Sequence, residues 1–259
     1  MDVLLSDFLL LGFAAVLAGL VDAVVGGGGL IQVPALFAVF PQTSPAILFG
    51  TNKLASVWGT AVAARTYAKR LSLDWGIAIP AAVAALIFAF LGARIVTGFP
   101  PELLRKALPF VLLAVAIYVY RRKDFGLQSE ADPTITIPIV RKRVLAIVIG
   151  SIIGFYDGFF GPGTGSFLIF LFVRIFYLDF LQASAVAKVV NVACNLAALA
   201  WFGMAGHMIW QLGLIMAICN IAGAVIGTRL AMWGGTGFVR KLFLAVVGLL
   251  ILKTGINAF

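Results

Sequence analysis

The chain contains 259 residues, of which 63% are apolar and 11% are charged, and its formal net charge is +9. Soluble globular domains have about 45–50% apolar and about 25% charged residues, so this composition excludes an ordinary soluble protein. We predict an all-α polytopic membrane protein in a lipid bilayer. Its cations are expected to lie beside the apolar spans and to bind no nucleic acid.

Apolar stretches follow one another along the chain, on both sides of a hydrophilic segment at residues 121–143. They cover residues 8–21, 30–40, 45–64, 75–98, 103–120, 144–160, 166–178, 180–205, 208–233 and 238–258. The first stretch lacks the basic start of a secretory signal, so we expect it to be retained as a span. The hydrophilic segment is rich in arginine and lysine, which predicts a cytoplasmic linker between a first helical repeat at residues 1–120 and a second at residues 144–259.

The two halves are related by one constant shift in numbering, the repeat shift, which takes Asp22 to Asp157 and Lys53 to Lys188. The same shift places the glycine run at residues 26–29 on the glycine-rich turn at residues 161–165. It also takes Trp75 to Trp210, Arg94 to Arg229, and Arg105-Lys106 to Arg240-Lys241. Because repeated halves are common in carriers that bind their ligand between the repeats, this duplication predicts a transporter.

The second apolar stretch of each half is short. Residues 30–40 provide about eleven positions, whereas a spanning helix needs about 20, and residues 166–178 are similarly few. We therefore expect about eight transmembrane helices plus two short re-entrant or broken helices, with four crossings in each half and parallel halves. The alternative is ten spans arranged as inverted five-helix repeats.

Glycine-rich turns precede both short stretches. They contain Gly26, Gly27, Gly28 and Gly29 in the first half and Gly161 and Gly163 in the second. Glycine permits positive φ and close backbone approach, so successive N–H groups can point to one place, beside the positive end of the following half-helix. Such a turn suits an anion. The alternative is that the glycines only permit tight helix packing.

One lysine and two polar residues share a face of the third stretch in each half. Lys53, Ser56 and Thr60 have the spacing i, i+3, i+7, and Lys188, Asn191 and Asn195 repeat it. Charged side chains within the bilayer usually face a cavity or a partner, so both faces are predicted to contribute to a ligand site. Alternatively, each lysine extends its ammonium group to the membrane interface.

Asp22 and Asp157 precede the glycine turns. A carboxylate in a low-dielectric site pairs with a cation or binds a proton, so each is expected to pair with a lysine or to carry protons. The alternative is a capping role at a helix end. His207 is the only histidine, and Cys194 and Cys219 lack metal-ligand spacing, so we predict no metal, no cofactor and no catalytic set, and hence no enzyme.

The segment Gly50-Thr51-Asn52-Lys53-Leu54, together with the run from Asp22 to Leu30, resembles the sulfite exporter TauE/SafE family of membrane permeases. The resemblance covers nearly the whole chain. It implies transport of a small sulfur-containing anion, such as sulfite, a sulfonate or sulfoacetate, across the bacterial inner membrane. In the second half Gly161, Gly163 and Lys188 remain, but Val186-Ala187 replaces the polar Thr-Asn pair, so the halves are expected to contribute unequally.

These residues together predict a secondary transporter. Backbone N–H groups of the glycine turns, Lys53 and Lys188 would bind the oxyanion. Thr51, Asn52, Asn191 and Asn195 would hydrogen-bond its oxygens, and Asp22 or Asp157 would couple movement to protons. An anion channel is the alternative, because it would use the same cations. The sequence leaves open the direction of transport and whether the protein forms a homo-oligomer.

Overall fold

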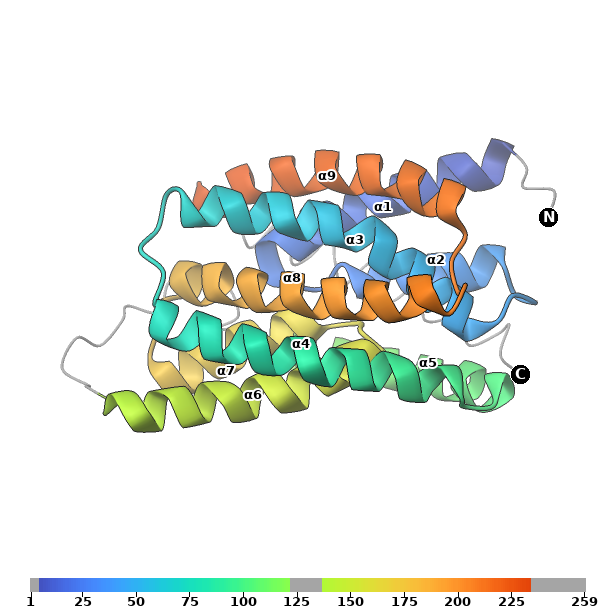
Figure 1. Cartoon of the computed structure of the whole chain (residues 1–259). Coiled ribbons are helices and arrows are strands. Elements are labelled where there is room, and N and C mark those ends of the chain that lie inside the picture. The colour runs from blue at the N-terminus through green and yellow to red at the C-terminus, as the bar shows by residue number, and fades with distance from the viewer. Residues whose placement is uncertain (1–4, 122–136, 234–259) are drawn as a thin grey trace.

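The computed structural model describes residues 5–121 and 137–233, and all regular secondary structure in these ranges is α-helical, which confirms the predicted all-α class. In chain order (Figure 1) the helices are α1 (Leu5–Val25), α2 (Gly29–Val39), α3 (Pro45–Ala68), α4 (Trp75–Thr97), α5 (Pro101–Arg121), α6 (Ile139–Phe159), α7 (Thr164–Phe176), α8 (Phe180–Met204) and α9 (Trp210–Met232). Most of the predicted linker and the last apolar stretch, with Arg240-Lys241, lie outside the described residues.

The helices differ in whether they are long enough to cross a bilayer. Among the described residues, α1, α4, α8 and α9 are both long and apolar enough to do so. Helices α3, α5 and α6 have comparable lengths of 24, 21 and 21 residues. Helices α2 and α7 have only 11 and 13 residues, which span about 16–20 Å, whereas the hydrocarbon core is about 30 Å thick. The two short apolar stretches therefore form helices that end inside such a layer.

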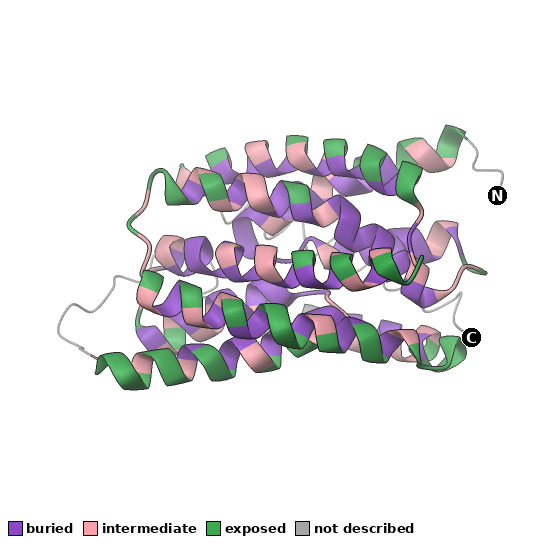
Figure 2. Ribbon diagram, viewed as in Figure 1, coloured by how far each residue is buried: buried purple, intermediate pink, exposed green. Residues whose placement is uncertain are grey.

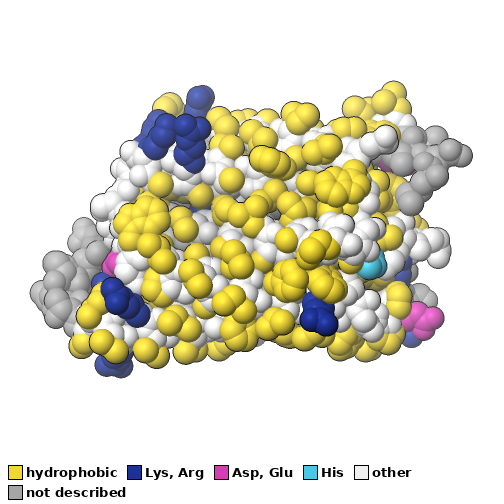
Figure 3. Space-filling view, viewed as in Figure 1, with side chains coloured by type: hydrophobic (Ala, Val, Ile, Leu, Met, Phe, Trp, Pro, Cys, Tyr) yellow, Lys and Arg dark blue, Asp and Glu magenta, His cyan; other side chains and the backbone are white. Residues whose placement is uncertain are grey.

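Apolar side chains cover the outside of the bundle as well as its interior. Ile79, Val83 and Ile87 of α4 and Ile218 of α9 are among the large hydrophobic residues that are exposed. Exposed residues lie on the outward faces of the helices (Figure 2), and hydrophobic side chains cover much of the visible surface, on which charged side chains are few (Figure 3). A soluble monomer rarely exposes so continuous an apolar surface, so this is the face expected to contact lipid.

Many of the described cations lie at one end of the bundle. Lys142 of α6 forms an ion pair of 2.8 Å with Asp74, the N-cap residue of α4, so the start of α6 lies beside the α3–α4 loop. Lys69 and Arg70 belong to that loop. Figure 1 shows that α5 begins at the opposite end, which places Arg105 there.

The most extensive helix packing joins the two halves. Helix α4 packs along α6, α9 packs along α1, and α3 contacts both α8 and α9. Small residues permit the close approach: a Cβ at Gly154 would overlap the backbone of Ala85, and a Cβ at Gly19 would overlap the backbone of Asn220. Figure 1 also shows that α3 and α8 run in opposite directions, as do α1 and α6 and α4 and α9.

The two glycine turns meet in the interior of the bundle. Gly26, with φ of +78°, separates α1 from α2, and Gly161 and Gly163, with φ of +90° and +86°, separate α6 from α7. The Ser166 backbone N–H donates to the Gly26 carbonyl at 3.0 Å, and the Ser166 hydroxyl donates to the Val25 carbonyl at 2.7 Å. A Cβ at Gly26 would overlap the backbone of Gly165, so only glycine permits this contact.

Candidate functional site

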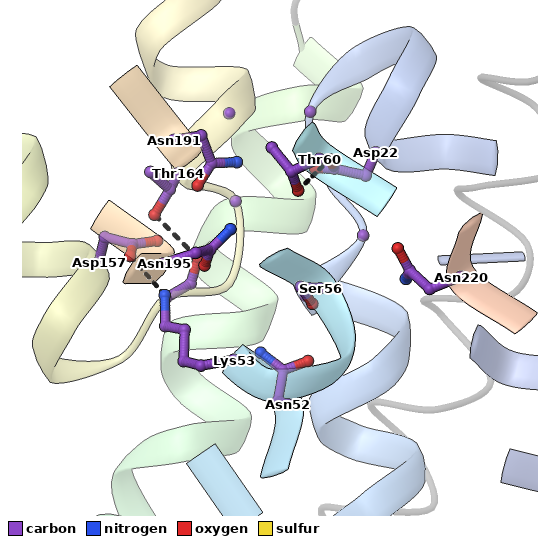
Figure 4. Close-up of a pocket in the computed structure, with 16 residues that line it drawn as sticks. Asp22, Asn52, Lys53, Ser56, Thr60, Asp157, Thr164, Asn191, Asn195 and Asn220 are labelled. Carbon is purple, nitrogen blue, oxygen red and sulfur yellow. Dashed lines mark hydrogen bonds and ion pairs between the residues drawn. The ribbon is translucent and has the colours of Figure 1, made fainter. Parts of the chain in front are cut away.

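A small polar cavity lies where the two glycine turns face α3 and α8 (Figure 4). Its volume is about 20 Å³, which is room for roughly one water molecule. It is lined by Asp22, Gly26, Gly28, Gly29, Asn52, Lys53, Ser56, Thr60, Asp157, Gly161, Gly163, Thr164, Gly165, Asn191, Asn195 and Asn220. In this apolar bundle, the cavity brings together polar groups from both halves of the chain.

The first ion pair beside the cavity joins Lys53 of α3 to Asp157 of α6. The two side chains are only 4% and 2% exposed. Figure 4 shows the ammonium group of Lys53 directed to the Asp157 carboxylate. Both ions therefore sit in a site that excludes bulk water, and each depends on the other for compensation.

The second ion pair joins Lys188 of α8 to Asp22 of α1, with 2.9 Å between Nζ and Oδ2. Lys188 also donates to the backbone carbonyl of Asp22, in the last turn of α1. The Thr60 hydroxyl donates to the same carboxylate at 3.2 Å. Lys188 is fully enclosed, whereas the Asp22 side chain is 14% exposed.

The two ion pairs cross between the halves. Each lysine pairs with the aspartate of the other half, and the repeat shift converts one pair into the other. Their surroundings nevertheless differ. Lys53 lines the cavity, but Lys188 does not, because it is held against the backbone at the end of α1. The four charges sum to zero, so an anion that enters changes the net charge of the site.

Most of the substrate-binding and coupling residues predicted from sequence line this cavity. Gly27, Thr51 and Lys188 do not. The Thr51 hydroxyl donates to the Ile47 carbonyl at 2.7 Å and accepts the Ile209 N–H at 3.0 Å. Thr51 thus binds the backbone around α3. The roles of these residues as ligands stay predictions.

Asn52 has a free acceptor at the cavity. Its Oδ1 atom is buried and has no hydrogen-bond partner in the described part of the chain. A buried polar atom without a partner costs about 1–3 kcal/mol, and such atoms are unusual away from functional sites. Rotation of the amide would instead offer its N–H donors to an anion beside Lys53.

Sequence reasoning missed Asn220 of α9 and Thr164 of α7, which also line the cavity. Asn220 donates to the Gln32 side-chain oxygen at 3.1 Å and to the Ala15 carbonyl at 3.3 Å. An asparagine inside the apolar stretch 208–233 was a usable signal, because amides are rare in membrane helices without a partner. Within residues 5–121 and 137–233, no three His, Cys, Asp or Glu residues lie close enough to hold a metal ion.

Comparisons with known proteins agree on the class of this chain. The sulfite exporter TauE/SafE family matches residues 11–254. A probable membrane transporter protein of Sinorhizobium, ORF9, is 37% identical over 90% of this chain and 86% of its own length. The probable membrane transporter protein YfcA of Escherichia coli is 31% identical over 95% of this chain and 89% of its own. A probable membrane transporter protein of Haemophilus influenzae is 30% identical over 93% of this chain and 92% of its own length. No solved structure matches the chain.

Proposed function

This chain belongs to the sulfite exporter TauE/SafE family of membrane transporters, and we propose that it is a secondary carrier for a small sulfur-containing oxyanion, such as sulfite, a sulfonate or sulfoacetate, in the bacterial inner membrane. The observation that carries the proposal is the pair of buried, crossed lysine–aspartate contacts beside a cavity between two glycine turns. Ammonium groups, amides and helix-start N–H groups are the donors that an oxyanion requires.

The anion binds to Lys53 in place of Asp157. A cavity of about 20 Å³ holds roughly one water, so an oxyanion enters only when the ion pair opens. The ammonium group exchanges one oxyanion for another, and Asn52, Asn191 and Asn195 lie around the same cavity to hydrogen-bond the remaining oxygens.

A proton accompanies the anion. Once displaced, Asp157 would be a buried carboxylate without a cation, which is costly in a site that excludes water. Binding one proton removes that charge and keeps the site near its resting net charge. Transport is therefore coupled to protons, with Asp157 as the carrier.

The halves act as inverted repeats. Helices α3 and α8 run in opposite directions, which supports this arrangement over the parallel one expected from four crossings in each half. In the first half the broken pair α1–α2 brings the chain back to the end at which it entered, and α3, α4 and α5 follow; in the second half α6–α7 does the same before α8 and α9. Alternating access then comes from the two halves exchanging their conformations around the crossed ion pairs.

Cysteine labelling from each side of the membrane tests this topology. In a background in which Cys194 and Cys219 are replaced by serine, cysteines at Lys106 and Lys241 label from opposite sides if the halves are inverted. Labelling of both cysteines from the same side would support parallel halves instead.

Transport by purified protein in liposomes tests the proposed function. We expect the double variant Lys53→Met/Asp157→Asn to fold, because it removes both charges together, and to transport labelled sulfite or sulfoacetate at least about 100-fold more slowly. Lys142→Ala, in the half-exposed pair at the bundle end, is the matched control and keeps parental transport. A folded double variant that transports as well as the parent would refute the site.

An anion channel uses the same cations but requires a continuous pore. A tight cavity closed by ion pairs favours a carrier. Uptake into liposomes and bilayer recordings separate the two. A carrier gives saturable uptake driven by the proton gradient, whereas a channel gives unitary currents that do not depend on that gradient.

A further inference from the structure

A second hollow lies away from the central cavity, between the start of α6 and the end of α7. It is an open groove of about 500 Å³, the size of many small-molecule sites. Arg141, Arg174 and Tyr177 supply its polar groups, and Leu145 and Ile175 are among its apolar walls. The start of α6 belongs to the cation-rich end of the bundle, beside the α3–α4 loop.

The two guanidinium groups have no counter-ion among the residues that the structure describes. Neither Arg141 nor Arg174 forms an ion pair within residues 5–121 and 137–233. Asp179, the acidic residue closest to Arg174 in sequence, instead caps α8 by accepting the Gln182 N–H at 2.8 Å. Asp74 is paired with Lys142. The groove therefore carries two positive charges that the described chain does not neutralise.

The position of Arg141 is unfavourable for its own helix. It lies in the first turn of α6, where the helix dipole is positive and a cation is disfavoured. Helix stability does not explain a cation there, whereas an external anion would. Tyr177, which is 40% exposed and has a φ of +56°, adds a phenol at the rim. Tyrosine is typical of the interface between hydrocarbon and headgroups.

The first half of the chain lacks this groove chemistry. The repeat shift relates Arg141, Arg174 and Tyr177 to Ser6, Val39 and Gln42. Neither cation has a counterpart, so the charge belongs to one membrane face only. Because the cation-rich end is expected in the cytoplasm, the groove faces the leaflet with the anionic surface potential.

We propose that this groove binds the phosphate of an anionic phospholipid headgroup. Two guanidinium groups can hold the phosphate oxygens, and the apolar walls cover the glycerol and the first acyl carbons. A ligand that is charged at one end and apolar at the other fits both parts of the groove. The site is independent of the transport chemistry, so its test does not depend on the substrate assignment.

Native mass spectrometry of the full-length protein in detergent tests this site with phosphatidylglycerol and phosphatidylcholine. We expect phosphatidylglycerol to bind about 30-fold more tightly, the effect of two cations near an anionic headgroup. The variant Arg141→Gln/Arg174→Gln should lose this preference, and Arg141→Lys/Arg174→Lys should retain part of it. Arg143→Gln, an exposed arginine in the same turn of α6 that does not line the groove, is the control and should keep it.

Three outcomes would overturn the lipid site. They are equal affinity for the two lipids, an unchanged preference in the double glutamine variant, and loss of bound phosphatidylglycerol when millimolar inorganic phosphate is added, which would identify a site for free anions. Unfolding of each variant without added lipid shows whether it has kept its fold before the lipids are compared.

Discussion

The two buried ion pairs have the same chemistry but different surroundings. Lys53 and Asp157 face the cavity and bind each other through their side chains alone. Lys188 is enclosed and binds both the carboxylate and the backbone carbonyl of Asp22, so it also fixes the end of α1. The two ion pairs are thus suited to different roles. The Lys53–Asp157 pair at the cavity can exchange partners, whereas the enclosed Lys188–Asp22 pair holds the glycine turn in place.

Removal of Lys188 should have the largest effect on stability. Lys188→Ala leaves Asp22 and a backbone carbonyl without their cation, and breaking a buried pair costs about 3–5 kcal/mol. Thermal unfolding in detergent measures this loss. The double variant Lys188→Met/Asp22→Asn is the control and should recover most of the stability. If Lys188→Ala unfolds at the parental temperature, the two pairs do not differ in the way described.

Alanine substitutions in the two glycine turns should separate stability from transport. Gly26→Ala places a Cβ against the backbone of Gly165 and should lower stability by several kcal/mol. At Gly161 the Cβ would be less crowded: it would lie 3.2 Å from Nζ of Lys53, which can move, and 3.2 Å from the Asp157 carbonyl oxygen. Both residues have positive φ, so each also bears about 1 kcal/mol of backbone strain. We expect Gly161→Ala to remain folded and to transport poorly.

The matched control for backbone strain is Gly206→Ala. Gly206 has a φ of +71°, and a Cβ added to it would meet no atom within 4 Å. This variant should therefore lose only the strain energy. Equal destabilisation by Gly26→Ala and Gly206→Ala would show that contact between the turns contributes little.

The aspartates should differ in how they affect the pH dependence of transport. If Asp157 carries the proton as proposed, parental uptake should rise as pH falls. Asp157→Asn should make uptake about tenfold less sensitive to pH, whereas Lys188→Met/Asp22→Asn, which removes both charges of the other pair, should keep the parental dependence. Initial uptake rates at acidic and neutral pH measure this. The opposite result would make Asp22 the proton carrier.

Substitution of Asn220 should have the smallest effect on transport. It has no polar counterpart in the first half, because the repeat shift relates it to Ala85. Asn220→Ala should change the ratio of sulfite to sulfoacetate transport several-fold, the effect of one neutral hydrogen bond of about 1 kcal/mol, while leaving pH dependence intact. An unchanged ratio would exclude Asn220 from contact with the substrate.

The sequence predicts the components of this site better than their pairing. Repetition identifies Lys53, Lys188, Asp22 and Asp157, because charges within apolar stretches have few structural explanations. Which lysine meets which aspartate depends on how the halves pack, and local spacing contains no such information. The short helices were also predictable from length, whereas the sequence left the relative directions of α3 and α8 open between parallel and inverted halves.

Two particular residues show the limits of motif reasoning. Neighbouring residues on a helix point in different directions, so Thr51 and Lys53 of one motif do not both reach the cavity. Thr51 binds backbone instead. Asn220 reaches the cavity without belonging to any repeated motif, so a search for duplicated residues passes over it.

Proton uptake on anion binding tests the exchange at Lys53 most directly. It is measured by calorimetry in buffers of different ionisation enthalpy, with fully ionised thiosulfate or sulfoacetate so that the ligand supplies no proton. The expected result is about one proton taken up per anion by the parent and by Lys188→Met/Asp22→Asn, and none by Asp157→Asn. Anion binding without proton uptake by the parent would contradict the account.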